Sequence, residues 1–161
     1  MNVDRAKLTR ILKFAGLALI VLLMAAQFVP VDRTNPPVGE EIVAPAEVLT
    51  VLERACYDCH SNETVWPVYS RVAPVSWLVA RDVHEGREAL NYSTWGRYSA
   101  EERSELLEES WEEVAEGEMP MKPYVLLHPA ARLTAEDEEV LRAWSLASGG
   151  RSDDGPASSD D

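Results

Sequence analysis

Two cysteines and a histidine stand close together in the segment Cys56-Tyr57-Asp58-Cys59-His60. Cys-x-x-Cys-His is the attachment pattern of c-type haem. Two thiols on one helical turn reach the two vinyl groups on one porphyrin edge, and the adjacent imidazole then ligates the iron. The chain has only these two cysteines. The motif predicts one covalent haem c, with Cys56 and Cys59 as thioether residues and His60 as proximal ligand.

Three other kinds of site use the same residue types. A dithiol redox motif usually lies beside a βαβ pattern, and this sequence has no such pattern. A zinc site needs four ligands, and His84 and His128 are spaced unlike the ligands of common zinc fingers. A disulfide between Cys56 and Cys59 is the simplest structural alternative in an oxidising compartment. The motif follows an export segment and ends an amphipathic helix, which favours haem.

A second axial ligand is expected farther along the chain. Methionine opposite histidine is the common arrangement in cytochromes c. Met119 lies in a predicted loop, and the proline after it stiffens that loop, so we predict Met119 as the distal ligand. His84 is the alternative ligand and His128 ranks after it. Met121 is expected to fill a gap in the core or to exchange with Met119.

Aromatic and basic residues follow the motif. Core packing is the ordinary role of aromatics, and a haem wall is a form of core packing. Three aromatic residues are therefore predicted to line the haem pocket: Trp66, Tyr69 and Trp77. Most arginines lie on the surface, but guanidinium groups also pair well with carboxylates such as haem propionates. Three arginines are candidates for that role: Arg71, Arg81 and Arg87.

An apolar segment near the start of the chain predicts a membrane anchor. Residues 14–29 carry no charge. With Ile11 and Leu12, and with Lys13 reaching toward the headgroups, the run approaches the ~20 residues that cross ~30 Å of hydrocarbon. We predict an anchor over 11–29. It is expected to stay uncleaved, because the run is longer than a signal-peptide core and Met24-Ala25-Ala26 lacks a small first residue.

Charge sets the orientation of this anchor. The chain has a net charge of −13, and the first 13 residues carry +3, so the rest carries −16. Positive flanks stay in the cytoplasm. The sequence predicts a single-pass protein of the inner (cytoplasmic) membrane, with a cytoplasmic N-terminus over 1–10 and its domain on the periplasmic side. Such an acidic domain repels nucleic acid and is compatible with a basic partner, although the charge also serves solubility.

Composition divides the remaining chain. Prolines and a glycine mark residues 30–45 as a tether. Residues 148–161 are small and acidic and are predicted to be a disordered tail. The predicted domain occupies 46–147.

Helical periodicity dominates that domain. Apolar residues follow a helical period over 46–55 and 74–90. Two capping boxes open further helices, Ser99 with Glu102 and Thr134 with Asp137, which end near Gly117 and near residue 149. No alternating strand pattern appears. The predicted class is all-α: a small cytochrome c-like helical domain with long loops over 56–73 and 117–133, preceded by one transmembrane helix.

The chain resembles the bacterial haem-binding domain proteins described by their C-x-x-C-H motif. The similarity runs from Gln27 to Trp144. It is carried by Gln27-Phe28-Val29-Pro30, Arg33-Thr34-Asn35-Pro36-Pro37, Cys56–Thr64, Trp66–Ser70, Ala73–Trp77, His84-Glu85-Gly86-Arg87, Leu90-Asn91-Tyr92-Ser93, Trp95, Gly117-Glu118-Met119-Pro120 and Tyr124. The resemblance implies haem binding at Cys56, Cys59 and His60 in a cytochrome c-like helical domain. By analogy with relatives fused to cytochrome c or di-haem peroxidase modules, it also implies an electron-transfer setting.

We therefore expect an electron carrier and not an enzyme, acting with a redox partner protein. The sequence shows no nucleophile–base pair and no second cofactor motif. Two alternatives remain open. A haem-based sensor or ligand-binding protein would need an open sixth position. A peroxidase-type enzyme would need a polar distal group, for which His84 with Arg81 or Arg87 is the only hint.

Overall fold

The computed structural model describes residues 5–149. The predicted tail over 148–161 therefore lies almost entirely outside the described residues. The described part is helical and contains no strand, which confirms the all-α class. The chain divides into two compact units. Unit 1 comprises Met1–Thr34 and Trp66–Asp82, and unit 2 comprises Asn35–Val65 and Val83–Asp161.

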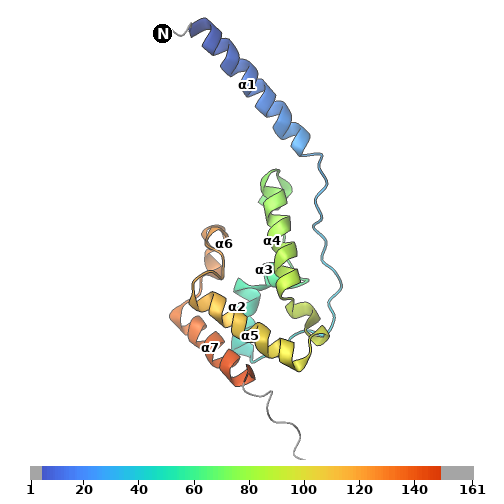
Figure 1. Cartoon of the computed structure of the whole chain (residues 1–161), viewed down its shortest axis with the longest axis vertical. Helices are drawn as coiled ribbons and strands as arrows, with labels where there is room; N and C mark the ends of the chain where they lie inside the picture. Colours follow the sequence, from blue (N-terminus) through green and yellow to red (C-terminus); the bar gives the residue numbers. More distant parts are fainter. Residues whose placement is uncertain (1–4, 150–161) are drawn as a thin grey trace, which may run out of the picture. The chain divides into compact units, whose positions relative to one another are not determined.

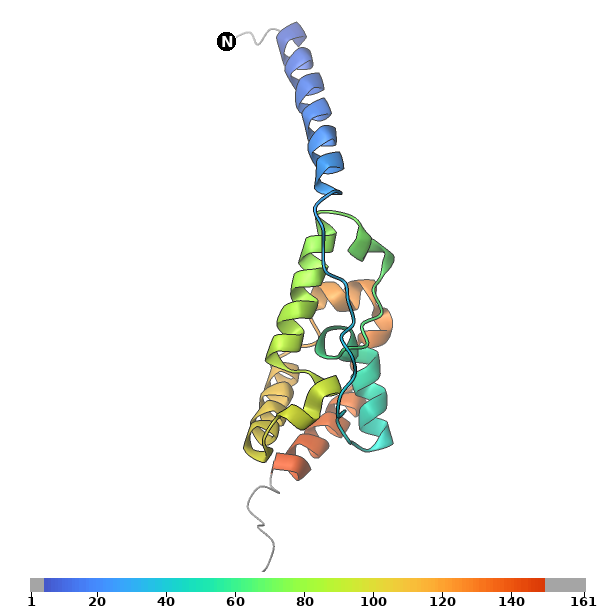
Figure 2. The same ribbon diagram turned by 90° about the vertical axis from the view of Figure 1, so that its right-hand side faces the viewer.

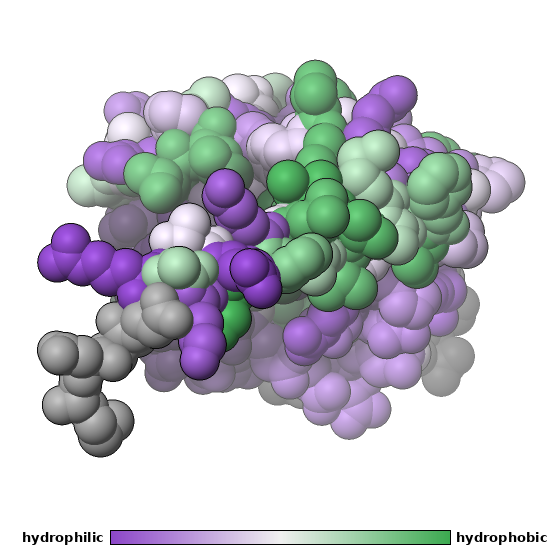
Figure 3. All heavy atoms as spheres, turned by 90° about the horizontal axis from the view of Figure 1, so that it is seen from above, coloured by the Kyte–Doolittle hydropathy of each residue, from purple (hydrophilic) through white to green (hydrophobic). Residues whose placement is uncertain are grey.

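Unit 1 contains the apolar helix α1, Arg5–Ala26. Its 22 residues would extend about 33 Å at 1.5 Å per residue, enough to cross a bilayer core. No side chain of α1 is buried, and exposed hydrophobic residues gather on the face seen in Figure 3. The helix begins before the predicted anchor because arginine and lysine are good helix formers. Within residues 5–149, α1 is the one helix long and apolar enough to span a membrane.

The rest of unit 1 is attached to the residues that follow α1 (Figures 1 and 2). The Gln27 side chain donates to the Ala73 carbonyl at 3.2 Å and accepts from the Ala73 N–H at 3.1 Å. Arg33 donates to the carbonyl of Ser70. Ser70 belongs to the short helix η1, Val68–Arg71. The side chains of Gln27 and Arg33 thus bind the backbone of the segment 66–82 and hold it beside the end of α1.

Helix α4, Val75–Ala89, contains the boundary between the units. It begins one residue after the predicted start. The predicted apolar face is only partly buried: Val83 is buried, whereas Val75 and Leu78 are exposed. Periodicity alone does not reveal which part of an apolar stripe other elements cover.

Three helices form the core of unit 2: α2 (Ala46–Ala55), α5 (Ala100–Ala115) and α7 (Ala135–Gly149). Helix α5 packs along α7, and α2 packs against α7 (Figure 1). On α2 the predicted apolar face is buried, with Val48 and Leu52 only 1% and 2% exposed. The core cluster adds residues from the neighbouring elements: Ile42, Val51, Leu90, Tyr92, Trp95, Leu107 and Leu141.

Both predicted capping boxes are present. The Glu102 N–H donates to the Ser99 hydroxyl and the Ser99 N–H donates to the Glu102 carboxylate. Thr134 and Asp137 exchange the same pair of bonds. These reciprocal bonds satisfy N–H groups that have no partner within the helix. The starts of α5 and α7 are therefore confirmed.

The two predicted long loops are wrong in part, because they hold short helices. Residues 56–73 contain α3 (Tyr57–His60) and η1. Residues 117–133 contain α6 (Lys122–Leu127) and η3 (Pro129–Ala131), and each has a proline in its first turn, where the fixed proline φ suits a helix. A further short helix, η2, covers Tyr92–Arg97. Elements of three to six residues are too short for periodicity to predict.

An ion pair ties α2 to α7 next to the haem motif. Arg54 contacts the Asp137 carboxylate at 2.7 Å and donates to the carbonyls of Ala130 and Arg132. Burial alone would raise the pKa of Asp137, but the bonds from Thr134 and Arg54 outweigh it and hold the pKa below its ordinary value of 3.8. Asp137→Asn is expected to lower the free energy of unfolding by about 1 kcal/mol at neutral pH.

The sign of the pH dependence follows from the lowered pKa. The stabilisation by Asp137 is complete above its unfolded pKa and is lost as pH falls through the folded pKa. Urea unfolding at pH 7 and below pH 4 should therefore show the cost of Asp137→Asn shrinking in acid. Glu139→Gln is the matched control, because its ion pair with Arg142 is exposed and should contribute little. An equal cost at both pH values would contradict the assignment.

Candidate haem site

The motif residues form a single helical turn directly after α2. The Cys56 N–H donates to the Leu52 carbonyl at 2.8 Å, which continues the α2 pattern. The N–H groups of Cys59 and His60 both donate to the Cys56 carbonyl, at 3.1 and 2.9 Å. This turn is α3. Cys56 and Cys59 are free thiols in the structure and are not joined in a disulfide.

The ring of His60 is held by the backbone that follows α4. Its Nδ1 lies 3.2 Å from the carbonyl oxygen of Leu90. A proton on Nδ1 satisfies that carbonyl and leaves the Nε2 lone pair free to ligate a metal. Burial lowers the pKa of His60 and outweighs the bonds to the carbonyls of Leu90 and Gly86. The imidazole is therefore neutral at pH 7, which is its ligating form.

Gly86 allows α4 to approach the motif turn closely. A Cβ at this position would lie 2.8 Å from the Cys59 carbonyl oxygen and 3.1 Å from the Cys59 Cβ. Both atoms are on or next to the backbone, so a side chain there would displace one element. The sequence interpretation assigned Gly86 no role. The sequence signal for this close approach was a lone glycine within a predicted helix, which often has a packing reason.

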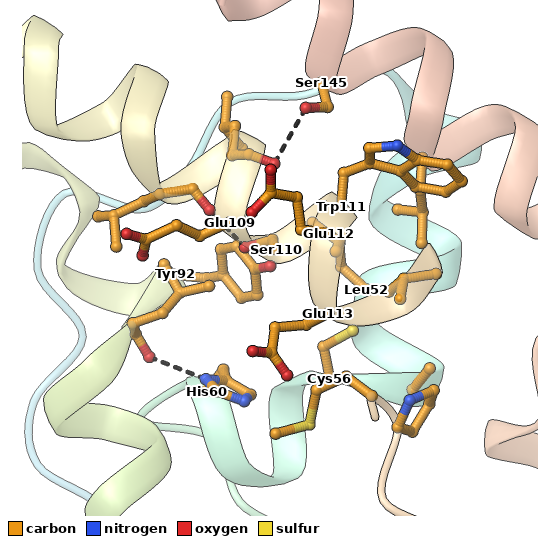
Figure 4. A pocket seen from close by; sticks show the side chains of 18 of the residues that line it. Leu52, Cys56, His60, Tyr92, Glu109, Ser110, Trp111, Glu112, Glu113 and Ser145 are labelled. Carbon is orange, nitrogen blue, oxygen red and sulfur yellow. Dashed lines mark hydrogen bonds between the residues drawn. The ribbon is translucent and has the colours of Figure 1, made fainter. Parts of the chain in front are cut away.

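A cavity of about 490 Å³ lies in unit 2 and brings the motif face to face with α5 and α7 (Figure 4). This volume is within the range of ~300–1,000 Å³ typical of small-molecule sites. Cys56 and His60 lie on the α2–α3 side, and Trp111 and Ser145 come from α5 and α7. Most other lining residues are apolar: Leu52, Ala55, Ala89, Leu90, Tyr92, Leu106, Leu107, Val114, Met119, Pro120, Leu141 and Trp144.

The end of α5 places Met119 in this cavity. Gly117 has φ +73°, a left-handed conformation that favours glycine. Its N–H donates to the Val114 carbonyl, and the N–H groups of Glu118 and Met119 both donate to the Glu113 carbonyl. The bonds from Gly117 and Glu118 form a Schellman motif. The chain turns sharply at Gly117, and Met119 joins Cys56 and His60 in one cavity.

Gly117→Ala is expected to lower the free energy of unfolding by about 1–2 kcal/mol, the cost of placing a Cβ in the left-handed region. A Cβ at Gly117 would meet no atom within 4 Å, so the cost would come from the backbone alone. Gly39→Ala is the control, because its Cβ would make only ordinary contacts. Urea denaturation measures both. Gly117→Asn should recover part of the loss, since asparagine tolerates this conformation better. Equal effects of Gly117→Ala and Gly39→Ala would contradict the argument.

The structure does not bring every predicted residue to the cavity. Cys59 lies on the same turn as His60, against Gly86, and is not among the lining residues. The predicted wall of Trp66, Tyr69 and Trp77 lies in unit 1 and does not line the cavity. The aromatic lining comes instead from Tyr92, Trp111 and Trp144, far from the motif in the sequence.

The other candidate ligands also lie outside the cavity lining. The side chain of His84 is 75% exposed, and its Nε2 lies 3.3 Å from Glu88. His128 stacks on Tyr124, with ring centroids 4.3 Å apart. Met121 precedes the first turn of α6. The structure therefore supports neither histidine as the residue opposite His60.

None of the three candidate arginines lines the cavity. Arg87 donates to the Ser61 carbonyl at 2.7 Å, to the Thr64 hydroxyl at 2.8 Å and to the Asn35 amide oxygen at 2.9 Å. These bonds fix the segment that leaves the motif. Arg71 and Arg81 belong to unit 1. In the structure, Arg87 therefore has a structural role, and its pairing with a propionate stays a hypothesis.

A buried polar network supports the motif turn, and the sequence interpretation gave it no function. Asn91 donates to the Asn62 amide oxygen at 2.8 Å, and the Asn62 N–H donates to the Ser93 hydroxyl at 3.0 Å. These three side chains are almost fully buried, so each bond prevents the cost of an unsatisfied polar group. On the motif itself, Asp58 accepts from the Tyr124 hydroxyl at 2.8 Å and thereby links α3 to α6. The sequence signal that could have indicated this network was the pair of small polar residues directly after the motif, Ser61 and Asn62.

Acidic residues of α5 lie where the cavity meets solvent. Glu109, Glu112 and Glu113 are exposed and line the cavity (Figure 4). They do not form a metal site with the motif: within residues 5–149, no group of three His, Cys, Asp or Glu side chains is placed to hold an ion. Burial also raises the pKa of Cys56 to about 12, so this thiol is protonated at neutral pH.

The comparison with protein families agrees with this geometry. The family model described as "Haem-binding domain" matches residues 21–147. No curated protein and no solved structure matches the chain significantly. The residues fit haem: a largely apolar cavity contains a thiol of the motif, a neutral histidine with a free Nε2 and a methionine. Because the match covers most of its length, the chain belongs to the haem-binding domain family.

Proposed function

We propose that this protein is a membrane-anchored c-type cytochrome domain that carries single electrons. Cys56 and Cys59 would hold one haem through thioether bonds, and His60 and Met119 would ligate its iron. The observation that carries the proposal is that Cys56, His60 and Met119 line the same cavity. The bound haem would supply one-electron chemistry, and the chain would bury it and fix its axial ligands.

The arrangement favours a carrier over an enzyme. With His60 and Met119 both on the iron, no axial position would be left for a substrate. The polar side chains around the motif are engaged in structural bonds, as Arg87 and Asp58 are. His84 is exposed and paired with Glu88, so it offers no distal acid–base group for a peroxidase reaction.

Helix α1 supports the anchoring part of the proposal. It is long and apolar enough to cross a membrane, and basic residues precede its apolar stretch. By the positive-inside rule the haem domain would face the periplasm, with α1 in the inner membrane. Cell fractionation with protease accessibility of the haem domain in spheroplasts tests this orientation.

The acidic rim supports a redox partner with a basic surface. Glu109, Glu112 and Glu113 lie at the cavity, where an electron would enter or leave. Opposite charge at such a rim accelerates encounter, and salt screens the effect. Electron transfer to a basic acceptor should therefore slow as ionic strength rises, and Glu112→Gln with Glu113→Gln should weaken that dependence.

Haem-stained denaturing gel electrophoresis tests the proposal directly. The chain is expressed with export and the cytochrome c maturation machinery. A stained band is expected to remain with the polypeptide, because thioether bonds survive denaturation. Cys56→Ala with Cys59→Ala should abolish the stain. A colourless wild-type chain, under conditions in which a control cytochrome matures, would refute covalent attachment.

A further inference from the structure

Unit 1 exposes a group of apolar side chains that the haem site does not explain. The group consists of residues after α1, residues of η1 and its flank, and the first turn of α4: Phe28, Val68, Val72, Val75, Trp77 and Leu78. Phe28 is 85% exposed and Val68 is 83% exposed. We call this group the juxtamembrane apolar surface. Clusters of this kind mark interaction sites on proteins that are otherwise polar outside.

The hydrogen bonds of Gln27 fix the position of this surface relative to the end of α1. Gln27 is the first residue after α1, and both atoms of its amide group bond to the Ala73 backbone. Ala73 lies between Val72 and Val75. The surface is therefore held at the end of the apolar helix (Figures 1 and 2). If α1 spans the bilayer, its last residues lie at the membrane–water boundary.

Charge distinguishes this segment from the rest of the chain. Residues 66–80 contain one charged residue, Arg71, and it is basic. The first 13 residues, at the other end of α1, carry +3. The remaining charges of unit 1 sum to +1: Asp32, Arg33, Arg71, Arg81 and Asp82. The chain outside unit 1 carries −17. Anionic headgroups attract a cationic, apolar segment. A tryptophan at its edge is typical of the membrane interface.

We propose that the juxtamembrane apolar surface lies in the headgroup region of the bilayer that α1 spans. This inference rests on the proposed membrane anchoring. Its apolar side chains would enter the boundary between headgroups and acyl chains, a depth of about 5–10 Å for interfacial segments. Lipid is the occupant because the surface is tied to the end of the anchor, has no acidic residue within 66–80 and carries a tryptophan. The segment 66–82 is therefore a second membrane contact and not a wall of the haem pocket.

Photolabelling of the full-length haem protein tests this proposal. The chain is placed in vesicles of phosphatidylethanolamine and phosphatidylglycerol that contain lipids with a diazirine near the carbonyl or at the end of the acyl chain. Mass spectrometry then locates the adducts. Peptides of α1 should react with both lipids. Peptides from 66–82 should react with the shallow lipid several-fold more than peptides of α7 do.

Variants sharpen the result. Val68→Asp and Leu78→Asp should lower shallow labelling of 66–82 several-fold, because the carboxylate moves the segment toward water. Val43→Asp is the matched control, since Val43 is 93% exposed but belongs to unit 2. It should leave the labelling unchanged.

The two hypotheses fail in different ways. Labelling of α1 with only background labelling of 66–82 would overturn the interfacial contact and leave the anchor standing. Background labelling of both would overturn the anchor and the contact together. Chain-to-chain cross-links through 66–82 in place of lipid adducts would assign the surface to a second copy and would also overturn the proposal.

Discussion

Gly86→Ala is expected to destabilise the haem-binding domain by about 1–3 kcal/mol, the usual cost of overpacking. In most helices the same change is stabilising by up to about 1 kcal/mol. Here the new Cβ would lie 2.8 Å from the Cys59 carbonyl oxygen. The clash is with backbone, so either α4 or the motif turn must move. The yield of covalent haem should fall as well, because Cys59 and His60 share that turn.

Two measurements check this prediction. Urea denaturation measures the loss of stability, and the ratio of haem stain to protein measures attachment. Gly16→Ala is the control, because Gly16 lies in a helix and a Cβ there would meet nothing within 4 Å. It should leave the haem yield unchanged and should not lower the stability. If Gly86→Ala keeps the stability and the haem yield of the wild-type protein, α4 does not pack closely against the motif turn.

The helices of unit 2 were largely predictable because their signals are local. Capping boxes mark the starts of α5 and α7, and Gly117 marks the end of α5. Each of these signals acts within a few residues of sequence. The meeting of Cys56, His60 and Met119 in one cavity was predictable for a related reason. Their residue types carry specific chemistry, so the prediction did not depend on knowing which surfaces face each other.

The walls of the cavity were not predictable in the same way. Trp66, Tyr69 and Trp77 follow the motif in sequence, but the bonds of Gln27 and Arg33 hold their segment beside the end of α1. Those bonds join residues 37 to 46 positions apart. Pairings over such distances depend on the whole fold and leave no periodic signal. Nearness in sequence to the motif was therefore a poor guide to the residues that line the cavity.

Met119→Ala is expected to leave haem attached and to open the sixth axial position. Covalent attachment would depend on Cys56 and Cys59, whereas Met119 reaches the cavity from the far end of α5. The reduced variant should bind carbon monoxide readily, whereas the wild-type protein should resist it. The reduction potential should fall, because a methionine ligand raises it. Absorption spectra of the reduced protein before and after carbon monoxide, together with redox titration, measure these changes.

Met121→Ala is the matched control for this variant. Met121 lies two residues away and precedes α6, but it does not line the cavity with His60. Its replacement should leave the axial spectrum and the potential unchanged. An altered spectrum in Met121→Ala with a normal one in Met119→Ala would mean that Met121, and not Met119, is the distal ligand. Ready binding of carbon monoxide by the wild-type protein would instead favour a sensor or ligand-binding role, because the sixth position would then be open without any substitution.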